Sequence, residues 1–209
     1  MIFFPLAPKV VCIDPGHPSE VGVGTRGKRL TELHAAWTVA VRLRDLLVKD
    51  GYRVVMTKST EKEYVRNRHR AEIANAARAD LMVRLHCDAS PRVGFAVYYP
   101  DRQGTAEGRT GPAVDVIRRT APLARRFHDA LAAGLRGGLT DQGLLSDTKT
   151  AVGGKQGALT GSIFSEVPVV LVEMATITLR HDEAFMLSEG GQRRMAESLE
   201  AGVAAALDH

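Results

Sequence analysis

The sequence predicts an α/β fold, a three-layer α/β/α arrangement around a largely parallel, mixed central sheet. Short apolar segments alternate with longer ones in which apolar residues recur at helical spacing. The most apolar segment, VPVVLVEM (167–174), shows no polar alternation, which is typical of a strand covered on both faces. Clusters of Gly, Pro and Asp separate the segments, so each is expected to be one element.

The N-terminal half is expected to alternate strands and helices. KVVCI (9–13) is an apolar strand followed by the turn Asp14-Pro15-Gly16. After a glycine-rich loop, Thr31 is placed as the N-cap of a helix that continues to Gly51. The next predicted elements are a strand over 52–57, a helix over 64–79, and strands over 81–86 and 94–99.

The C-terminal half is expected to contain two long surface loops. Residues 100–120 and 140–165 are rich in Gly and Thr and show no clear period. Between them the pattern predicts a helix over 121–135, with Pro122 near its start. A strand over 167–174 and a helix over 192–207 complete the prediction.

Length and composition favour a single globular domain, 1–209. The chain is 44% hydrophobic and 25% charged, which is typical of globular proteins. No segment approaches the roughly 18 apolar residues needed to cross a bilayer, so no transmembrane segment is expected. The opening MIFFPLAP lacks a basic region and contains two prolines, so no signal peptide is predicted there.

The charge balance favours an anionic partner but not nucleic acid. The formal net charge is +4, which suits a polymer carrying carboxylates or phosphates, or simply a mildly basic solvated surface. Aromatic residues make up 5% of the chain and do not interleave with an arginine-rich segment, so a surface for stacking bases is not expected.

The two cysteines, Cys12 and Cys87, are too few for a disulfide framework. Both lie in predicted strands, where free cysteine behaves as a small hydrophobic residue. A bridge between them is the alternative, because adjacent strands could bring them close.

Four residues with metal-binding or proton-transfer chemistry are expected at one edge of the sheet. His17 follows the first strand, His86 and Glu173 end later strands, and Glu32 opens the first long helix. Each has an ordinary alternative: a histidine that is simply hydrogen-bonded, or a glutamate that favours the helix dipole. Two histidines and one carboxylate can also bind catalytic zinc, leaving Glu173 as the base that activates water.

The other histidines are predicted to lie outside this site. His34 stands two residues after Glu32 and should face away from it, and His69 and His128 are expected to be solvated. His209 is terminal. His181 is the open case, because it could line the cleft eight residues after Glu173.

Several segments resemble the zinc-dependent N-acetylmuramoyl-L-alanine amidases of the amidase 3 family. They are VCIDPGH (11–17), Glu32, ANAARADLMVRLHCDA (74–89) and VPVVLVE (167–173), in the family's order. The resemblance implies that His17, Glu32 and His86 bind Zn²⁺ and that Glu173 is catalytic.

The sequence departs from the family pattern around the pocket. Arg84 and Asp88 stand where the family commonly has Ser and Asn, EMATIT (173–178) replaces ELGF, and Lys155 or Gln156 replaces an arginine. These changes concern the substrate pocket more than the metal. Some members carry an extra helix that blocks the site until a partner removes it. Residues 100–165 are predicted to hold one ordinary helix, so no such plug is expected.

The resemblance implies hydrolysis of the amide between the lactyl group of N-acetylmuramic acid and the L-alanine of the peptidoglycan stem peptide. It also implies a location in the cell envelope, periplasmic or extracellular. A protein activator is compatible with the resemblance. One alternative is a zinc peptidase or deacylase acting on another cell-wall amide. Another is a non-catalytic wall-binding module, which is disfavoured because all four site residues are present.

Overall fold

The computed structural model describes residues 7–207. The opening segment at 1–6 and the terminal His209 lie outside the described residues. A six-stranded sheet has the order β2-β1-β3-β8-β4-β7. The strands are β1 (Val10–Pro15), β2 (Arg53–Met56), β3 (Leu81–Asp88), β4 (Phe95–Tyr99), β7 (Asp141–Ser146) and β8 (Val169–Thr176).

The sheet is mixed. Strands β2, β1, β3 and β8 run parallel to one another, whereas β4 pairs antiparallel with β8 and parallel with β7. Because four neighbouring strands are parallel, their carboxyl ends meet at one edge. The predicted α/β class with a largely parallel, mixed sheet is confirmed.

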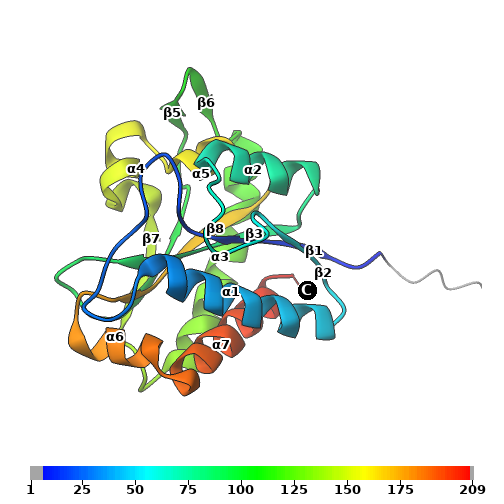
Figure 1. Cartoon of the computed structure of the whole chain (residues 1–209). Helices are drawn as coiled ribbons and strands as arrows, with labels where there is room; N and C mark the ends of the chain where they lie inside the picture. The colour runs from blue at the N-terminus through cyan, green and yellow to red at the C-terminus, as the bar shows by residue number, and fades with distance from the viewer. Residues whose placement is uncertain (1–6, 208–209) are drawn as a thin grey trace, which may run out of the picture.

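Helices cover both faces of the sheet (Figure 1). Residues of α1 (Glu32–Lys49), α3 (Val114–Leu135) and α7 (Glu189–Leu207) share one large apolar core with the sheet. The opposite face carries α2 (Asn67–Ala76), α4 (Ala151–Gln156) and α5 (Thr160–Ile163). The remaining elements are α6 (Arg180–Leu187) and a hairpin of β5 (Gly104–Ala106) and β6 (Arg109–Gly111).

Alternation along the strands decides which side chains meet the large core. In β3, Leu81, Val83, Leu85 and Cys87 enter that core. Successive strand residues point to opposite faces, so Arg84, His86 and Asp88 point to the other face. One face of the sheet therefore buries apolar side chains, whereas the other carries polar ones near the carboxyl ends of the strands and apolar ones, such as Met82 and Val169, towards their starts.

The first helix confirms its predicted cap. Thr31 has extended backbone angles, and its hydroxyl accepts a hydrogen bond from the His34 amide at 3.3 Å. In contrast, α2 begins at Asn67, three residues after its predicted start at 64. Contacts with the preceding loop explain the delay, because the Val65 amide donates to the Pro18 carbonyl and the Asn67 amide to Glu20.

The predicted start of the helix at 121 is wrong. Helix α3 begins at Val114 and contains Pro122 in its interior. Val116, Thr120 and Ala124 are buried at helical spacing, so packing favours the longer helix. Pro122 lies on the exposed side, where water can bond to the carbonyl that proline leaves without a donor.

The two predicted loops are also wrong in part. Residues 100–120 include the β5–β6 hairpin and the start of α3, and 140–165 include β7, a 3-10 turn (Asp147–Lys149), α4 and α5. Residues 100–165 therefore hold three α-helices rather than one. Helices of six and four residues are too short to produce a clear helical period, and β7 is an edge strand.

The alternative of a disulfide bridge is wrong, because Cys12 and Cys87 are both free and buried. The register of β1 against β3 places Cys12 opposite Met82. Cys12 packs with Met82 on one face of the sheet, and Cys87 belongs to the large core on the other. The sheet itself therefore separates the two thiols.

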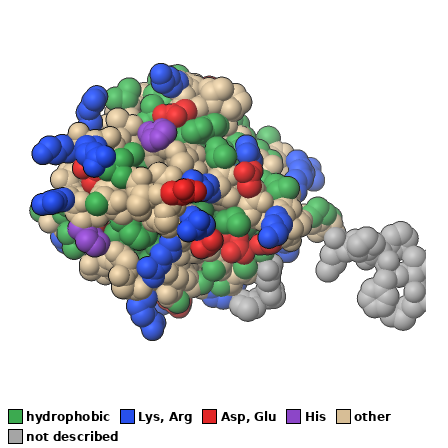
Figure 2. Space-filling view, turned by 60° about the horizontal axis from the view of Figure 1, so that its bottom comes forward, with side chains coloured by type: hydrophobic (Ala, Val, Ile, Leu, Met, Phe, Trp, Pro, Cys, Tyr) green, Lys and Arg blue, Asp and Glu red, His purple; other side chains and the backbone are tan. Residues whose placement is uncertain are grey.

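Within residues 7–207, no helix is both long and apolar enough to cross a membrane. Figure 2 shows the side of the molecule near α1 and α7, where Lys and Arg side chains stand at separate places with Asp and Glu among them.

Candidate metal centre

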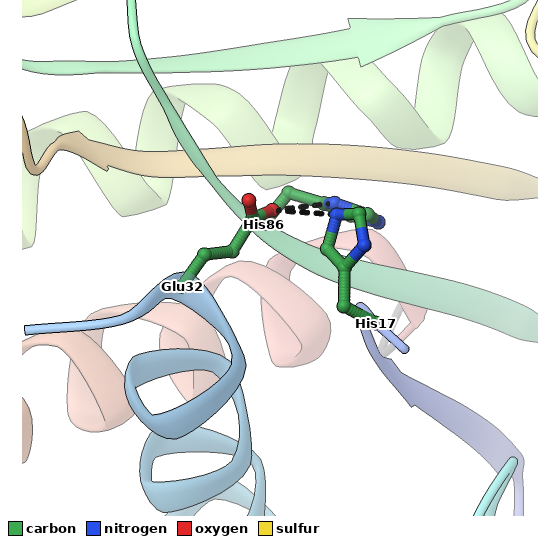
Figure 3. Close-up of side chains that lie close together, drawn as sticks. All are labelled: His17, Glu32 and His86. Carbon is green, nitrogen blue, oxygen red and sulfur yellow. Dashed lines mark hydrogen bonds and ion pairs between the residues drawn. The ribbon is translucent and has the colours of Figure 1, made fainter. Parts of the chain in front are cut away.

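Three of the four predicted site residues converge at one edge of the sheet (Figure 3). His17 follows β1, Glu32 is the first residue of α1, and His86 lies near the end of β3. One potential ligand atom from each lies within 4.8 Å of the other two. Two imidazoles and a carboxylate at this separation can hold a divalent metal ion.

Glu32 lies at the centre of the cluster. Its Oε1 is 3.2 Å from His17 Nε2 and 2.8 Å from His86 Nδ1, and it accepts the Cys87 amide at 3.1 Å. Its Oε2 accepts the Thr25 amide at 2.6 Å. With 3% of the residue exposed, the carboxylate is held in one orientation by the surrounding donors.

The two histidines have different surroundings. His17 Nδ1 lies 3.0 Å from the Gly22 carbonyl, which can only accept, so this nitrogen donates. His17 Nε2 lies 3.2 Å from Glu32 Oε1, where it can bind a metal through its lone pair or, when protonated, donate to the carboxylate. His86 Nε2 is buried and has no hydrogen-bond partner. A buried nitrogen without a partner costs free energy. The other ring nitrogen of His86, Nδ1, is the one that faces the Glu32 carboxylate.

Two glycines let the backbone approach these side chains. A Cβ on Gly16 would lie 2.5 Å from His86 Cε1, so the imidazole packs directly on the Gly16 backbone. Gly24 has φ +86°, and a Cβ there would lie 2.7 Å from both Glu32 Oε2 and His17 Cδ2. The glycine-rich loop can therefore close over the cluster only with glycine at 24.

The charges of the cluster influence one another. Burial alone would raise the pKa of Glu32, but hydrogen bonds from His17 and His86 hold it below its ordinary value. Burial opposes the charged form of His17, yet the bond to Glu32 raises its pKa. Burial dominates at His86 and lowers its pKa. Neutral imidazole and ionised carboxylate are the forms that bind metals, so Glu32 and His86 are prepared for this role.

The fourth predicted residue, Glu173, lies on the neighbouring strand. It is opposite His86 in the β3–β8 register, and its Oε2 is buried without a hydrogen-bond partner. Burial raises its pKa well above the ordinary value, and the negative charges of Glu32 and Asp88 add to the rise. A carboxyl group with these properties beside a metal cluster can take up and release a proton.

A buried ion-pair cluster supports the site from behind. Asp14 accepts hydrogen bonds from Arg70 Nη1 at 2.6 Å, Arg84 Nε at 2.9 Å and Thr57 Oγ1 at 2.6 Å. Burial would raise the pKa of Asp14, but Arg70 and Arg84 hold it below its usual range. Arg70 also donates to the Pro15 and Pro18 carbonyls on either side of His17. The cluster thus fixes the loop that carries His17.

These supporting residues were missed from the sequence. The charges inside the apolar segments VCID and LMVRLH were a usable signal, because a buried charge requires a partner. Lys58 gave no such signal, yet it is 3% exposed and its ammonium donates to the carbonyls of His17 and Glu61. His17 has a left-handed φ of 55°, a conformation that costs free energy. The hydrogen bond from Lys58 to its carbonyl helps to stabilise that conformation.

A pocket of about 400 Å³ opens over the cluster. Its floor includes His17, His86 and Glu173, and its walls include residues 149–152 at the start of α4 and 159–161 at α5. The short helices missed from the sequence therefore form one wall of the pocket. Arg84 and Asp88, the departures from the family pattern, also line it.

The other described histidines lie outside the three-residue cluster. His34 pairs with Glu61 at 3.3 Å, away from the cluster as predicted. His69 pairs with Glu72 on an exposed helix face, which agrees with the predicted solvation. The prediction for His128 is wrong, since its side chain is 13% exposed and lies between Asp129 and Asp141. His181 is 71% exposed and does not line the pocket.

Comparison with known proteins agrees with this arrangement. A family model of N-acetylmuramoyl-L-alanine amidases matches residues 11–205. The germination-specific N-acetylmuramoyl-L-alanine amidase of Bacillus subtilis is 30% identical over 59% of this chain and 60% of its own length. The amidase AmiC of Escherichia coli O6:H1 is 29% identical over 95% of this chain and 52% of its own length. The chain thus spans roughly half or somewhat more of these two relatives.

Solved structures share the fold. The amidase Ami1 of Mycobacterium smegmatis superposes with a TM-score of 0.80 at 24% identity, covering 97% of this chain and 98% of that one. The amidase AmiC2 of Nostoc punctiforme gives a TM-score of 0.77 at 22% identity, with 96% and 98% covered. With a family model matched from Val11 into the last helix, the chain belongs to the N-acetylmuramoyl-L-alanine amidase family.

Proposed function

We propose that this chain is a zinc-dependent N-acetylmuramoyl-L-alanine amidase. It hydrolyses the amide between the lactyl group of N-acetylmuramic acid and the L-alanine of the peptidoglycan stem peptide. The observation that carries the proposal is the convergence of His17, Glu32 and His86 beside Glu173 in one pocket, in a chain of this amidase family.

Zinc fits the three residues proposed to hold it. Catalytic zinc sites commonly combine histidine and carboxylate ligands and keep one position open. His17 Nε2 and His86 Nδ1 both face Glu32 Oε1, at 3.2 and 2.8 Å, and these three potential ligand atoms support a cation at this place. Zinc bound there would act as a Lewis acid, polarising the scissile carbonyl and making water more acidic.

Glu173 is proposed to transfer the proton. Its free Oε2 can accept a proton from the attacking water and then deliver it to the departing amine of L-alanine. The surroundings support both steps, because a raised pKa allows the carboxyl group to hold the proton between them. The ion-pair cluster of Asp14 and Arg70 keeps the His17 loop in place meanwhile.

The proposal assigns residues 1–209 to one catalytic domain. The family's substrate places its action in the cell envelope, and we propose a periplasmic or extracellular location. Peptidoglycan is the proposed partner, and nucleic acid is not. The proposal leaves room for a protein activator.

Digestion of purified peptidoglycan tests the proposal directly. Zinc-loaded protein should release stem peptides that begin with L-alanine, detected by mass spectrometry of the products. Shortened peptides or liberated acyl groups would instead identify a zinc peptidase or deacylase acting on another cell-wall amide. Binding to peptidoglycan without any product would identify a non-catalytic wall-binding module.

The metal requirement is tested on the same preparation. Elemental analysis should find about one zinc per chain, and a chelator should abolish product release until zinc is restored. Freshly prepared protein that is active without metal would remove the proposed role of His17, Glu32 and His86.

A further inference from the structure

The pocket has a positively charged part beyond Glu173. Arg92 and Lys149 line it, together with Tyr98 and Leu171. Arg92 precedes β4, and Lys149 lies in the 3-10 turn before α4. Both side chains belong to exposed residues, so their charges are available to a ligand in the pocket.

The sheet places Arg92 close to the end of β8. Because β4 runs antiparallel to β8, the residues before β4 lie at the edge where β8 ends. The Arg92 carbonyl accepts hydrogen bonds from Thr176 Oγ1 at 2.6 Å, Ser90 Oγ at 3.1 Å and Gln142 Nε2 at 3.3 Å. The backbone of this pocket-lining arginine is therefore held in position.

Neither cation has an acidic partner. Within residues 7–207, the guanidinium of Arg92 and the ammonium of Lys149 make no ion pair. Arg84, the third cation of the pocket, differs because Asp14 neutralises it and it is 2% exposed. Arg92 and Lys149 are thus the pocket cations with unsatisfied charge.

Tyr98 lies between charges of opposite sign. It is 5% exposed, and its ring forms part of the pocket. Burial raises the pKa of Tyr98, Glu173 and Asp88 add to the rise, and Arg92 opposes it. Acidic and basic groups thus line the same pocket as Tyr98, namely Glu173, Asp88 and Arg92.

On the basis of the function proposed above, we propose that Arg92 and Lys149 bind a carboxylate of the stem peptide. This subsite makes the enzyme prefer peptides with free carboxylates over peptides in which the same groups are amidated. A guanidinium binds a carboxylate through two charge-assisted hydrogen bonds, whereas a neutral amide offers it one carbonyl. Asp88, together with Glu173 once it is ionised, repels a carboxylate from the hydrolytic end, so the peptide is oriented with its charge away from the scissile amide.

The test compares one muropeptide before and after chemical amidation of its carboxylates. Binding is measured at low ionic strength in the Glu173→Gln background, so that no ligand is consumed. We expect the free-acid form to bind at least about tenfold tighter, the scale of one charge-assisted hydrogen bond. This preference should shrink as salt is added.

Two double variants separate the subsite from general charge. Arg92→Gln with Lys149→Gln should lose the preference. Arg180→Gln with Lys62→Gln, which removes the same charge from exposed residues outside the pocket, should keep it. Equal binding of both ligands by the parent protein, or a preference retained without Arg92 and Lys149, would overturn the inference.

Turnover of the same ligands distinguishes this inference from the proposed function. Zinc-loaded wild-type protein should release peptide faster from the free-acid form, mainly through a lower KM. If it releases peptide from neither form, the proposed amidase function fails. The binding preference still decides whether the carboxylate subsite exists.

Discussion

The two faces of the sheet differ in what their side chains do. Towards α1, α3 and α7, the strands present apolar residues such as Val11, Val83 and Val172, which are completely buried. On the opposite face, the same strands present Arg84, His86 and Glu173 to the pocket and Asp14 to the ion-pair cluster. Near their carboxyl ends the strands thus supply packing to one face and chemistry to the other, because their side chains alternate.

The difference is also energetic. Burial of apolar surface stabilises the first face by about 25 cal/mol for each Å² removed from water. The second face contains buried atoms without hydrogen-bond partners, His86 Nε2 and Glu173 Oε2, each costing about 1–3 kcal/mol. Apolar burial in the core therefore offsets the cost of a site that opposes folding of the metal-free chain.

Substitution in the core should produce the largest loss of stability. Phe127 is fully buried and its ring packs against Gly202 of α7. Phe127→Ala should reduce the free energy of unfolding by about 3–5 kcal/mol through lost burial and a cavity. Zinc content and turnover of the folded fraction should stay unchanged. Denaturant titration with a parallel activity assay checks both, and a specific loss of zinc would contradict the separation of the faces.

Substitution of the two glutamates should affect chemistry more than stability. Glu173→Gln preserves size but removes the proton acceptor, so zinc should stay bound while turnover falls by about 10² or more. Glu32→Gln removes the charged ligand at the centre of the cluster, so zinc affinity should fall together with activity.

Zinc content and turnover of both variants, measured side by side, check this assignment. Circular dichroism provides the control that each variant is folded. If Glu173→Gln loses zinc while Glu32→Gln retains it, the roles of the two glutamates are reversed.

Much of the fold was predictable because its long elements carry clear patterns. The apolar period of α1, its Thr31 cap and the apolar strands β3 and β8 each agree with the local sequence. The start of α3 was not predictable from local preference, since Pro122 suggested a helix start that packing of Val116 and Thr120 overrides. Short elements such as α4 and β7 depend on tertiary contacts and leave too few residues for a period.

The candidate site was predictable to a different extent. His17, Glu32 and His86 follow from strand ends and family motifs, and the structure brings them together. The residues that hold them were not predicted, because Asp14 and Arg70 meet across 56 positions of the chain. Neither apolar periodicity nor motif spacing in the sequence predicts this ion pair, because it forms only once the sheet and α2 have assembled.

The glycine-rich loop offers a smaller test on the pocket face. At Gly24, alanine would be strained by φ +86° and would also collide with Glu32 and His17. Gly51 has φ +89° and nothing within 4 Å of an added Cβ. It follows the end of α1 opposite Glu32, so it is a matched control for backbone strain alone. Gly24→Ala should weaken zinc affinity by about tenfold or more, the scale of altered support for metal ligands.

Competition with a chelator measures this effect. Gly51→Ala should lose some stability but keep its zinc affinity. Equal affinities for the two variants would show that the close approach at Gly24 does not shape the cluster.

The smallest expected effect is a pH dependence of the metal-free protein. Burial and the charges of Glu32 and Asp88 raise the pKa of Glu173 well above its ordinary value of 4.5. Below about pH 4.5 the carboxyl group is protonated in both the native and unfolded states, so it does not affect stability. Above that pH the unfolded chain releases a proton that the native protein retains, so this group lowers native stability as the pH rises.

Glutamine cannot ionise. In chelator-treated samples, Glu173→Gln and wild type should therefore melt at similar temperatures near pH 4. The variant should gain an advantage on the order of 2–4 °C towards pH 8, the shift that about 1 kcal/mol produces in a chain of this size. Thermal melts across this range provide the measurement, and restoring zinc is the control, because a bound cation favours the ionised carboxylate and should reduce the difference. A difference in melting temperature that does not vary with pH would mean that Glu173 is ionised in the native metal-free protein, and that the pocket face is better solvated than its buried, unpartnered Oε2 indicates.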